Sequence, residues 1–179
     1  IGGMTTPVVA LSALAANLVS GDTNGHGDAF LVNPLDPDGD AMPTAWETSF
    51  AFDAFDATDG ALDADGDGAT NAQEAAAQTH PRGLASATRY FAEGARSSFF
   101  TTEFSVANPG TETATVLLRY AGGTGRVAST PVDVPARSSR KVTVPDTGIS
   151  EFATRVASDV PVVVDRLMSW TPGVGYGAH

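Results

Sequence analysis

The stretch DADGDGATNAQE, residues 63–74, carries an oxygen-bearing side chain at almost every second position and ends in a glutamate. Its carboxylates have no basic neighbour, so they repel one another unless a cation lies among them. A calcium loop of the EF-hand type takes ligands at positions 1, 3, 5, 7, 9 and 12, with glycine at position 6 and a main-chain carbonyl at position 7. An acidic surface loop that binds no cation would not be expected to have a suitable residue at every position of this ligand pattern, which we call the frame. The predicted ligands are Asp63, Asp65, Asp67, the Ala69 carbonyl, Asn71 and Glu74, with Gly68 at position 6.

The same frame fits the earlier stretch DPDGDAMPTAWE, residues 36–47, with two departures. Position 6 is Ala41, so the turn must be built differently, and Gly39 can contribute to it. Position 9 is Thr44, a poorer ligand that can act through water. Each loop runs into a segment that favours a short helix, TAWETSF after the first and NAQEAAAQ after the second. The predicted ligands here are Asp36, Asp38, Asp40, the Met42 carbonyl and Glu47.

Two further groups of oxygen-bearing residues lie near the loops without completing a frame. The group between the loops either completes their coordination or binds another ion, and turns and helix N-caps explain its aspartates equally well. The upstream group lacks a closing glutamate, and a hairpin turn at its Asn-Gly pair is an alternative explanation. We therefore expect two calcium ions, or three if one of these groups binds its own. The groups are Asp53, Asp56 and Asp59 between the loops, and Asp22, Asn24 and Asp28 upstream.

The net charge of −11 is unevenly distributed along the chain. The residues before Arg82 include 13 acidic and no basic side chains, whereas 8 acidic and 10 basic side chains follow from Arg82 onward. This change predicts a domain boundary near residues 82–87, and the acidic front half argues against nucleic-acid binding. The absence of cysteine excludes disulfides and thiolate metal sites. No apolar run approaches the length of a membrane span.

Residues from Arg89 onward predict a β-sandwich of about seven strands. Short β-branched and aromatic runs are separated by Asn, Pro, Gly and Ser turns, and alternation within them gives a strand one buried face. Trp170 is expected in the core, the alternative being a surface platform together with the glycine-rich tail. The runs are RYFAEG, FFTTEFSVANPG, TATVLLRYAGG, GRVASTPVDVP, RKVTVPD, FATRVASD and VPVVVDRLMSW.

Three parts of the sequence resemble known bacterial families. Residues 33–82, with DPDGDAMPTAWE, DADGDGATNAQE and THPRG, resemble the paired acidic repeats of bacterial extracellular proteins related to thrombospondin type-3 repeats. The part that begins with YFAEG resembles immunoglobulin-like C-terminal modules of secreted bacterial proteins, which mediate contacts or act as spacers. The segment LSALAANLVSGDTNGHGDAFLV resembles one incomplete blade of a bacterial β-propeller. A dockerin pair is also similar, but Glu47, Glu74 and the alanine-rich second helix depart from its pattern.

The predicted fold is mainly β and has three segments. Residues 1–33 form an N-terminal strand or hairpin segment, which can serve as a donor strand. Residues 34–84 form an EF-hand-like calcium-binding linker with short helices, and residues 85–179 form an immunoglobulin-like β-sandwich. The resemblance to thrombospondin type-3 repeats implies that the linker is extracellular and calcium-bound.

Catalytic patterns are missing from this sequence. No nucleophile elbow and no phosphate-binding glycine loop accompanies its serine, histidine and aspartate residues. The carboxylates fit metal frames rather than an isolated acid–base pair. His26, His80 and His179 are scattered, and we predict no metal or catalytic role for them. The protein is therefore expected not to be an enzyme.

The expected function is that of an extracellular, calcium-stabilised structural protein that assembles head to tail into a filament. The apolar segment TTPVVALSALAANLV is an aggregation hazard unless it is paired, and it can add as a strand to the sheet edge of the next copy. The alternative is that it folds back onto its own sandwich or onto residues 28–32. A second functional hypothesis is a calcium-stiffened spacer and adhesion module of a larger secreted protein, with the sandwich binding glycans.

Overall fold

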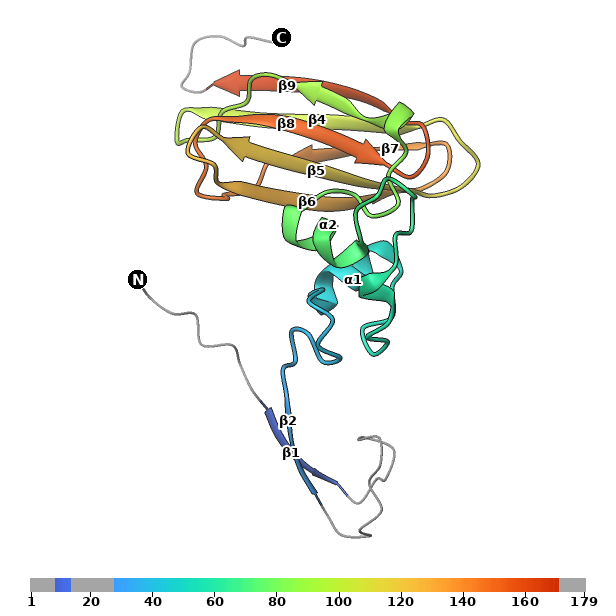
Figure 1. Ribbon diagram of the computed structural model, residues 1–179. Coiled ribbons are helices and arrows are strands. Elements are labelled where there is room, and N and C mark those ends of the chain that lie inside the picture. Colours follow the sequence, from blue (N-terminus) through green and yellow to red (C-terminus); the bar gives the residue numbers. More distant parts are fainter. Residues whose placement is uncertain (1–8, 14–27, 171–179) are drawn as a thin grey trace.

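The computed structural model describes residues 9–13 and 28–170, and within them the protein is mainly β. Figure 1 shows a β-sandwich at one end, short helices beside it and a β-hairpin at the other end. The hairpin pairs β1 (Val9–Ala13) with β2 (Asp28–Val32) in antiparallel register. No helix among the described residues is long and apolar enough to cross a membrane. The mainly β class that the sequence predicts is confirmed.

Seven strands form the sandwich, and each overlaps one of the seven runs predicted from the sequence. Four of them make one antiparallel sheet in the order β3-β8-β5-β6, and three make the other in the order β7-β4-β9. The strands are β3 (Arg89–Phe91), β4 (Phe100–Asn108), β5 (Ala114–Gly122), β6 (Val127–Val134), β7 (Ser138–Thr143), β8 (Phe152–Ser158) and β9 (Val163–Trp170).

The core of the sandwich lies between the two sheets, where buried side chains alternate with exposed ones. On β4, Phe104 is fully buried while its neighbour Ser105 is exposed. The rings of Tyr120 and Phe152 pack edge to face across the core, with centroids 5.4 Å apart. Trp170 is half-buried at the end of β9 and is not part of the buried cluster. Burial of these apolar side chains provides the main stabilisation of the sandwich.

The first, fourth and seventh strands of the sandwich depart from the immunoglobulin order. In immunoglobulin sandwiches the first strand shares a sheet with the second and fifth, and the seventh shares one with the third and sixth. Here the first strand, β3, pairs with the sixth, β8, and the last, β9, pairs with the second, β4. The fourth strand, β6, pairs with the third, β5, instead of sharing a sheet with the fifth. The pairings of β4 with β7 and of β5 with β8 do follow the immunoglobulin pattern. The N–H of Leu84 donates to the carbonyl of Ser158, so the chain enters beside β8 and directs β3 to that sheet.

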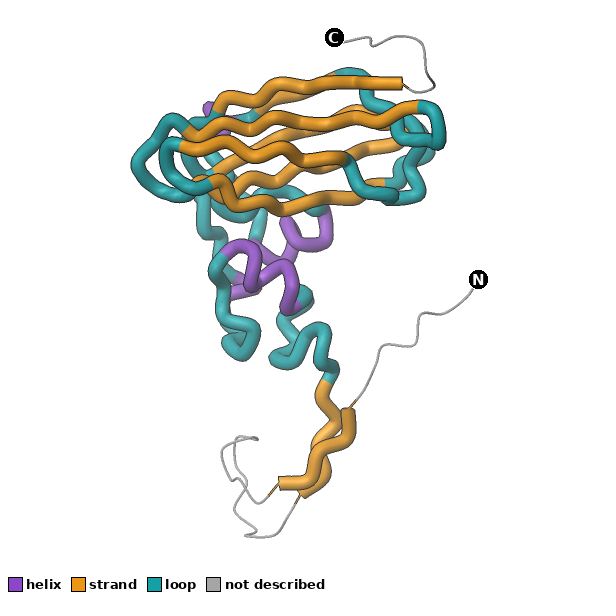
Figure 2. The backbone as a smooth tube through the Cα atoms, turned by 180° about the vertical axis from the view of Figure 1, so that it is seen from behind, coloured by secondary structure: helices purple, strands orange, loops and turns teal. Residues whose placement is uncertain are grey.

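Two short α-helices lie between the hairpin and the sandwich (Figure 2), α1 (Thr44–Phe50) and α2 (Asn71–Ala77). The N-terminus of α2 has a capping box, because Thr70 and Gln73 each bond the main chain of the other. Each helix ends at a residue in the left-handed conformation, Ala51 with φ 56° and Gln78 with φ 54°. The 3₁₀ helices η1 (Asp59–Ala61) and η2 (Ala85–Ala87) flank α2 in the sequence.

The linker packs against the outer face of the four-stranded sheet. Leu117 on β5 and Ala157 on β8 lie outside the core cluster, yet they are only 1% and 3% exposed. Residues 78–80 lie over them and exclude water. The Nε of Arg119 also donates to the carbonyl of Ala77, at the end of α2, over 3.1 Å. Sequence patterns alone did not predict this interface.

His80 anchors the interface as a neutral ring. Its Nε2–H donates to the carbonyl of Thr115 at 2.8 Å, and its Nδ1 accepts the N–H of Arg82 at 3.0 Å. The ring is 2% exposed and meets the ring of Phe50 edge on, with centroids 4.8 Å apart. Burial lowers the pKa of His80 below its ordinary value of 6.5. Both ring nitrogens are therefore engaged by the protein itself.

Lowering the pH is expected to destabilise the folded chain through His80. The unfolded ring takes up a proton near pH 6.5, whereas the folded ring resists protonation because it is buried and its Nδ1 faces an N–H donor. The contribution of His80 to stability is therefore constant above about pH 6.5 and falls below that value.

A His80→Gln variant isolates this effect, because glutamine keeps a donor and an acceptor and does not titrate. The free energy of unfolding of the native chain should fall relative to that of the variant between about pH 7 and about pH 5. Parallel curves for the two chains over this range would contradict the prediction.

Candidate metal centre

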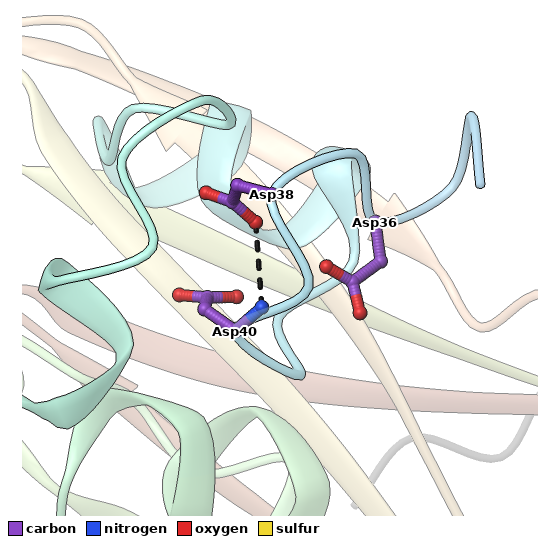
Figure 3. A group of neighbouring side chains, drawn as sticks. All are labelled: Asp36, Asp38 and Asp40. Atoms are coloured by element: carbon purple, nitrogen blue, oxygen red, sulfur yellow. Dashed lines mark hydrogen bonds between the residues drawn. The ribbon is translucent and has the colours of Figure 1, made fainter. Parts of the chain in front are cut away.

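The first acidic loop brings its carboxylates together in the turn before α1. Asp36, Asp38 and Asp40 each place a carboxylate oxygen within 4.8 Å of the others. Figure 3 shows the three side chains around the loop, with the N–H of Asp40 donating to Oδ1 of Asp38 at 3.4 Å. Gly39 and Ala41 make the turn with positive φ values of 80° and 76°. Ala41 thus adopts the conformation expected of the glycine at position 6, at a cost of roughly 1 kcal/mol.

Glu47 carries a fully buried carboxylate into this cluster from α1. It is 0% exposed, and neither of its carboxylate oxygens has a hydrogen-bond partner. One of these oxygens lies within 4.8 Å of carboxylate oxygens of Asp40 and Asp59. Burial, reinforced by the neighbouring charges of Asp38 and Asp40, raises the pKa of Glu47 to about 7. A buried carboxylate without a partner is costly, so the arrangement favours a cation or a proton at this place.

Asp59 reaches the same cluster from the segment between the two loops. Its Oδ2 accepts the N–H of Asp53 at 3.1 Å, and its Oδ1 is buried without a partner. The next residue, Gly60, lies directly against the carboxylate of Asp40. From the sequence, Asp59 could be either a metal ligand or a turn residue. In the structure its carboxylate lies close to those of Asp40 and Glu47.

Gly60→Ala is expected to weaken calcium binding in the first loop, because the new Cβ would collide with the carboxylate of Asp40. Displacing one carboxylate ligand should lower the affinity by about tenfold, or about 1.4 kcal/mol. Gly123→Ala is the matched control, since nothing lies within 4 Å of a Cβ there. Calorimetry on the whole chain measures both variants, and equal affinities would show that the position of Asp40 does not matter to the cation.

The second loop repeats this arrangement with glycine in the turn. Asp63, Asp65 and Asp67 each place a carboxylate oxygen within 4.8 Å of the others. Gly66 and Gly68 have positive φ values of 77° and 94°, a conformation that glycine adopts readily. The N–H groups of both glycines donate to the carboxylate of Asp63, at 2.7 and 2.9 Å. The main chain therefore holds the first carboxylate of the loop in place.

Glu74 supplies a buried carboxylate from α2 to the second loop. It is 2% exposed, and its Oε1 accepts the hydroxyl of Thr79 at 3.2 Å while its Oε2 is buried without a partner. Burial, followed by the charge of Asp65, raises the pKa of Glu74 to about 7. Each loop thus has three clustered aspartates and is followed by a helix that carries one buried glutamate. Of the two glutamates, Glu47 joins a carboxylate cluster with Asp40 and Asp59.

Met42 and Ala69 occupy equivalent places in the two loops. The N–H of Met42 donates to Oδ1 of Asp40 at 2.7 Å, and the N–H of Ala69 donates to Oδ1 of Asp67 at 2.8 Å. These bonds hold the main chain at position 7 beside the third aspartate of each loop. The ligand role of the two carbonyls stays a prediction.

Asn71, predicted as a ligand of the second loop, is held by hydrogen bonds to the main chain. The side chain is fully buried, with Oδ1 accepting the N–H of Ala64 at 3.2 Å and Nδ2 donating to the carbonyl of Asp59 at 2.7 Å. The amide is thus engaged by two main-chain groups that are distant in the sequence. Local spacing alone could not have indicated this role.

The remaining predicted residues are placed apart from the two clusters or outside the described residues. Asp53 and Asp56 are exposed turn residues, whose carboxylates accept the N–H groups of Phe55 and Thr58, respectively. Asp28 begins β2. Asp22, Asn24, His26 and His179 lie outside the described residues.

Similarity between this chain and known proteins is slight. No family model matches the chain, and no curated protein matches it. Among solved structures, the Anabaena sensory rhodopsin transducer is similar over 45% of this chain and 85% of its own chain. The two are 22% identical and superimpose with a TM-score of 0.37. A likeness of this degree carries no inference about function.

Proposed function

We propose that this chain is an extracellular structural protein whose linker is stabilised by calcium. The observation that carries the proposal is the fully buried Glu47, whose two oxygens lack hydrogen-bond partners beside Asp40 and Asp59. On α2, which follows the second loop, Glu74 is likewise buried and has one carboxylate oxygen without a hydrogen-bond partner. A divalent cation at each place would neutralise carboxylates that otherwise repel one another.

Calcium is the cation that suits this ligand set. It takes six to eight oxygen ligands in flexible geometry, whereas magnesium demands a tight octahedron and retains several waters. Zinc and copper sites use histidine nitrogen or cysteine sulfur as a rule. The chain has no cysteine, and both nitrogens of His80 are engaged by the main chain. Oxygen ligands are therefore what the described residues offer at the two loops.

The proposed role of the cations is mechanical. A cation at the first site would join Asp40 of the loop, Glu47 of α1 and Asp59 of η1, three segments that are otherwise connected by turns. The linker lies between the hairpin and the sandwich (Figure 1), so its stiffness would fix the distance between them. A cation enclosed by protein ligands has no open position for a substrate, and we propose no catalytic role.

Head-to-tail assembly is the second part of the proposal, and the distribution of charge supports it. The residues before Arg82 carry 13 acidic and no basic side chains, and the rest of the chain carries an excess of basic ones. The front of one copy would therefore attract the sandwich of the next. Because the two surfaces differ, the contact is heterologous and propagates unless it closes into a ring.

The β9 edge is the proposed acceptor for the neighbouring copy. It is eight residues long, and it exposes Val163 and Leu167. The other sheet edges have features that oppose pairing, because β3 has three residues and β6 contains Pro131. The β7 edge carries two adjacent charges of the same sign, Arg140 and Lys141, whereas the two charges of β9, Asp165 and Arg166, are opposite in sign. Since β1 already pairs with β2, the hairpin as a unit would be the donor rather than a single free strand.

Electron microscopy and light scattering of the whole chain, with and without calcium, test the proposal. Polymers should form with calcium and disappear when residues 1–20 are deleted or when Leu167→Lys places a charge on the β9 edge. Calcium binding, measured separately, should be unchanged in both variants. Assembly that survives the deletion would rule out strand donation, and monodisperse monomers with carbohydrate affinity would favour the spacer and adhesion module instead.

A further inference from the structure

The two candidate cation sites are joined by the side chain of Asn71. Its Nδ2 donates to the carbonyl of Asp59, whose carboxylate belongs to the first site. Its Oδ1 accepts the N–H of Ala64, the second residue of the second loop. Asn71 also begins α2, which carries the buried Glu74, the glutamate predicted to close the second loop. One amide therefore contacts main chain that belongs to both sites.

Further hydrogen bonds fix the start of α2 to η1. The N–H of Asn71 donates to the carbonyl of Leu62 at 2.7 Å, and the N–H of Leu62 donates to the carbonyl of Asp59 at 3.1 Å. Residues three apart on a helix lie on one side, so Asn71 and Glu74 point the same way, and both are buried. A displacement of η1 must therefore move Glu74 or break these bonds.

We propose that Asn71 couples the two sites, so that calcium bound at one raises the affinity for calcium at the other. This inference rests on the proposed function. A cation at the first site fixes the position of Asp59 and therefore of η1. Because Asn71 is hydrogen-bonded to Asp59, the positions of α2 and Glu74 are fixed as well. The second cation then enters a site whose conformational ordering has already occurred. By linkage, the coupling acts equally in the opposite direction.

The sign of the coupling separates this mechanism from simple electrostatics. Two divalent cations repel one another, so without a structural connection the second would bind with equal or lower affinity. Positive coupling therefore reports the connection through Asn71, which acts as a positioning residue for Asp59 and Glu74.

Trp46 provides a fluorescent reporter on α1, the helix that carries Glu47 of the first site. It precedes Glu47 on α1, and its ring centroid lies 4.6 Å from that of Phe50. The other tryptophan, Trp170, lies on β9 and can be replaced by phenylalanine. In the whole Trp170→Phe chain, fluorescence during a calcium titration follows the first site, while calorimetry counts the ions bound in total.

The test is a double-mutant cycle in this background. Glu74→Gln, which disables the second site, should raise the half-saturating calcium concentration of the first site about tenfold. In the Asn71→Ala chain the same change should shift it by less than about twofold. Asn71→Asp, which keeps an acceptor but lacks the Nδ2 donor, should also lose the coupling. Thr70→Ala is the matched control, because it removes the cap of α2 but leaves Asn71, and it should keep the tenfold shift.

Three results would overturn the coupling, and they are distinguishable. Equal half-saturation with and without Glu74→Gln, in a chain that retains Asn71 and binds two ions, means that the sites are independent. Loss of the shift in Thr70→Ala means that the stability of α2, rather than the amide of Asn71, connects them. No calcium binding by calorimetry would remove the proposed function together with this inference.

Discussion

Removing calcium should unfold the linker while the sandwich stays folded. Without cations, Glu47 and Glu74 are buried carboxylates with unpartnered oxygens. Glu47 lies beside Asp40 and Asp59, and the negative charges of Asp65, Asp67 and Asp63 act on Glu74. At a calcium concentration of about 100 times the dissociation constant, each site adds about 2.7 kcal/mol to the stability of the linker. Loss of the binding free energy of both sites is enough to unfold a segment that has two short helices and little hydrophobic core of its own.

Hydrogen exchange with and without a chelator measures this effect segment by segment. Protection should be lost in α1 and α2 and retained in β4, β5 and β8, which form the centre of the sandwich. Leu117 and Ala157 should lose their cover, so the adjoining outer face of β5 and β8 becomes more accessible. Unchanged exchange in the helices after chelation, in chains shown to be free of calcium, would contradict the prediction.

Phe104→Ala should destabilise the sandwich by about 3–5 kcal/mol, whether or not calcium is present. The side chain is fully buried on β4, and its ring contacts that of Phe91 with centroids 5.2 Å apart. Its removal would leave a cavity between the two sheets, which cannot move together to fill it because the strands on both sides hold them apart. Ser105→Ala, on the exposed face of the same strand, is the matched control and should change stability by no more than about 0.5 kcal/mol.

Denaturant unfolding with and without a chelator checks this prediction. The loss caused by Phe104→Ala should be the same in both conditions, because the core of the sandwich lies away from the acidic loops. A loss that depends on calcium would mean that the linker and the sandwich unfold as one cooperative unit.

Elements with a regular period could be predicted from the sequence. The seven strands of the sandwich follow runs bounded by turn residues, and the two helices follow Pro43 and Thr70 where a helix start was expected. The two acidic loops gather the aspartates that their spacing selects. These features depend on residues that are close in the sequence, so local patterns indicate them.

Contacts between distant segments could not be predicted in this way. The approach of Asp59 to Glu47 and the engagement of Asn71 with Asp59 depend on how folded elements meet. The sheet in which β3, β6 and β9 each lie depends on this too. The cover of Leu117 by residues 78–80 is another such case, because an apolar residue on the outer face of a strand gives no indication of its partner.

The position of β9 determines how the sandwich responds to a pulling force. The linker joins the sandwich at Leu84, which is hydrogen-bonded to Ser158 at the end of β8. The strand β9 begins five residues after Ser158, at the same end of the sandwich, and runs to Trp170 at the opposite end (Figure 1). Tension between Leu84 and Trp170 is therefore directed along the strands. It slides β9 lengthwise past β4, to which β9 is paired from Val163 to Trp170. All the hydrogen bonds between β9 and β4 then bear the force at the same time. Pulling β9 away from one end would instead break these bonds one after another.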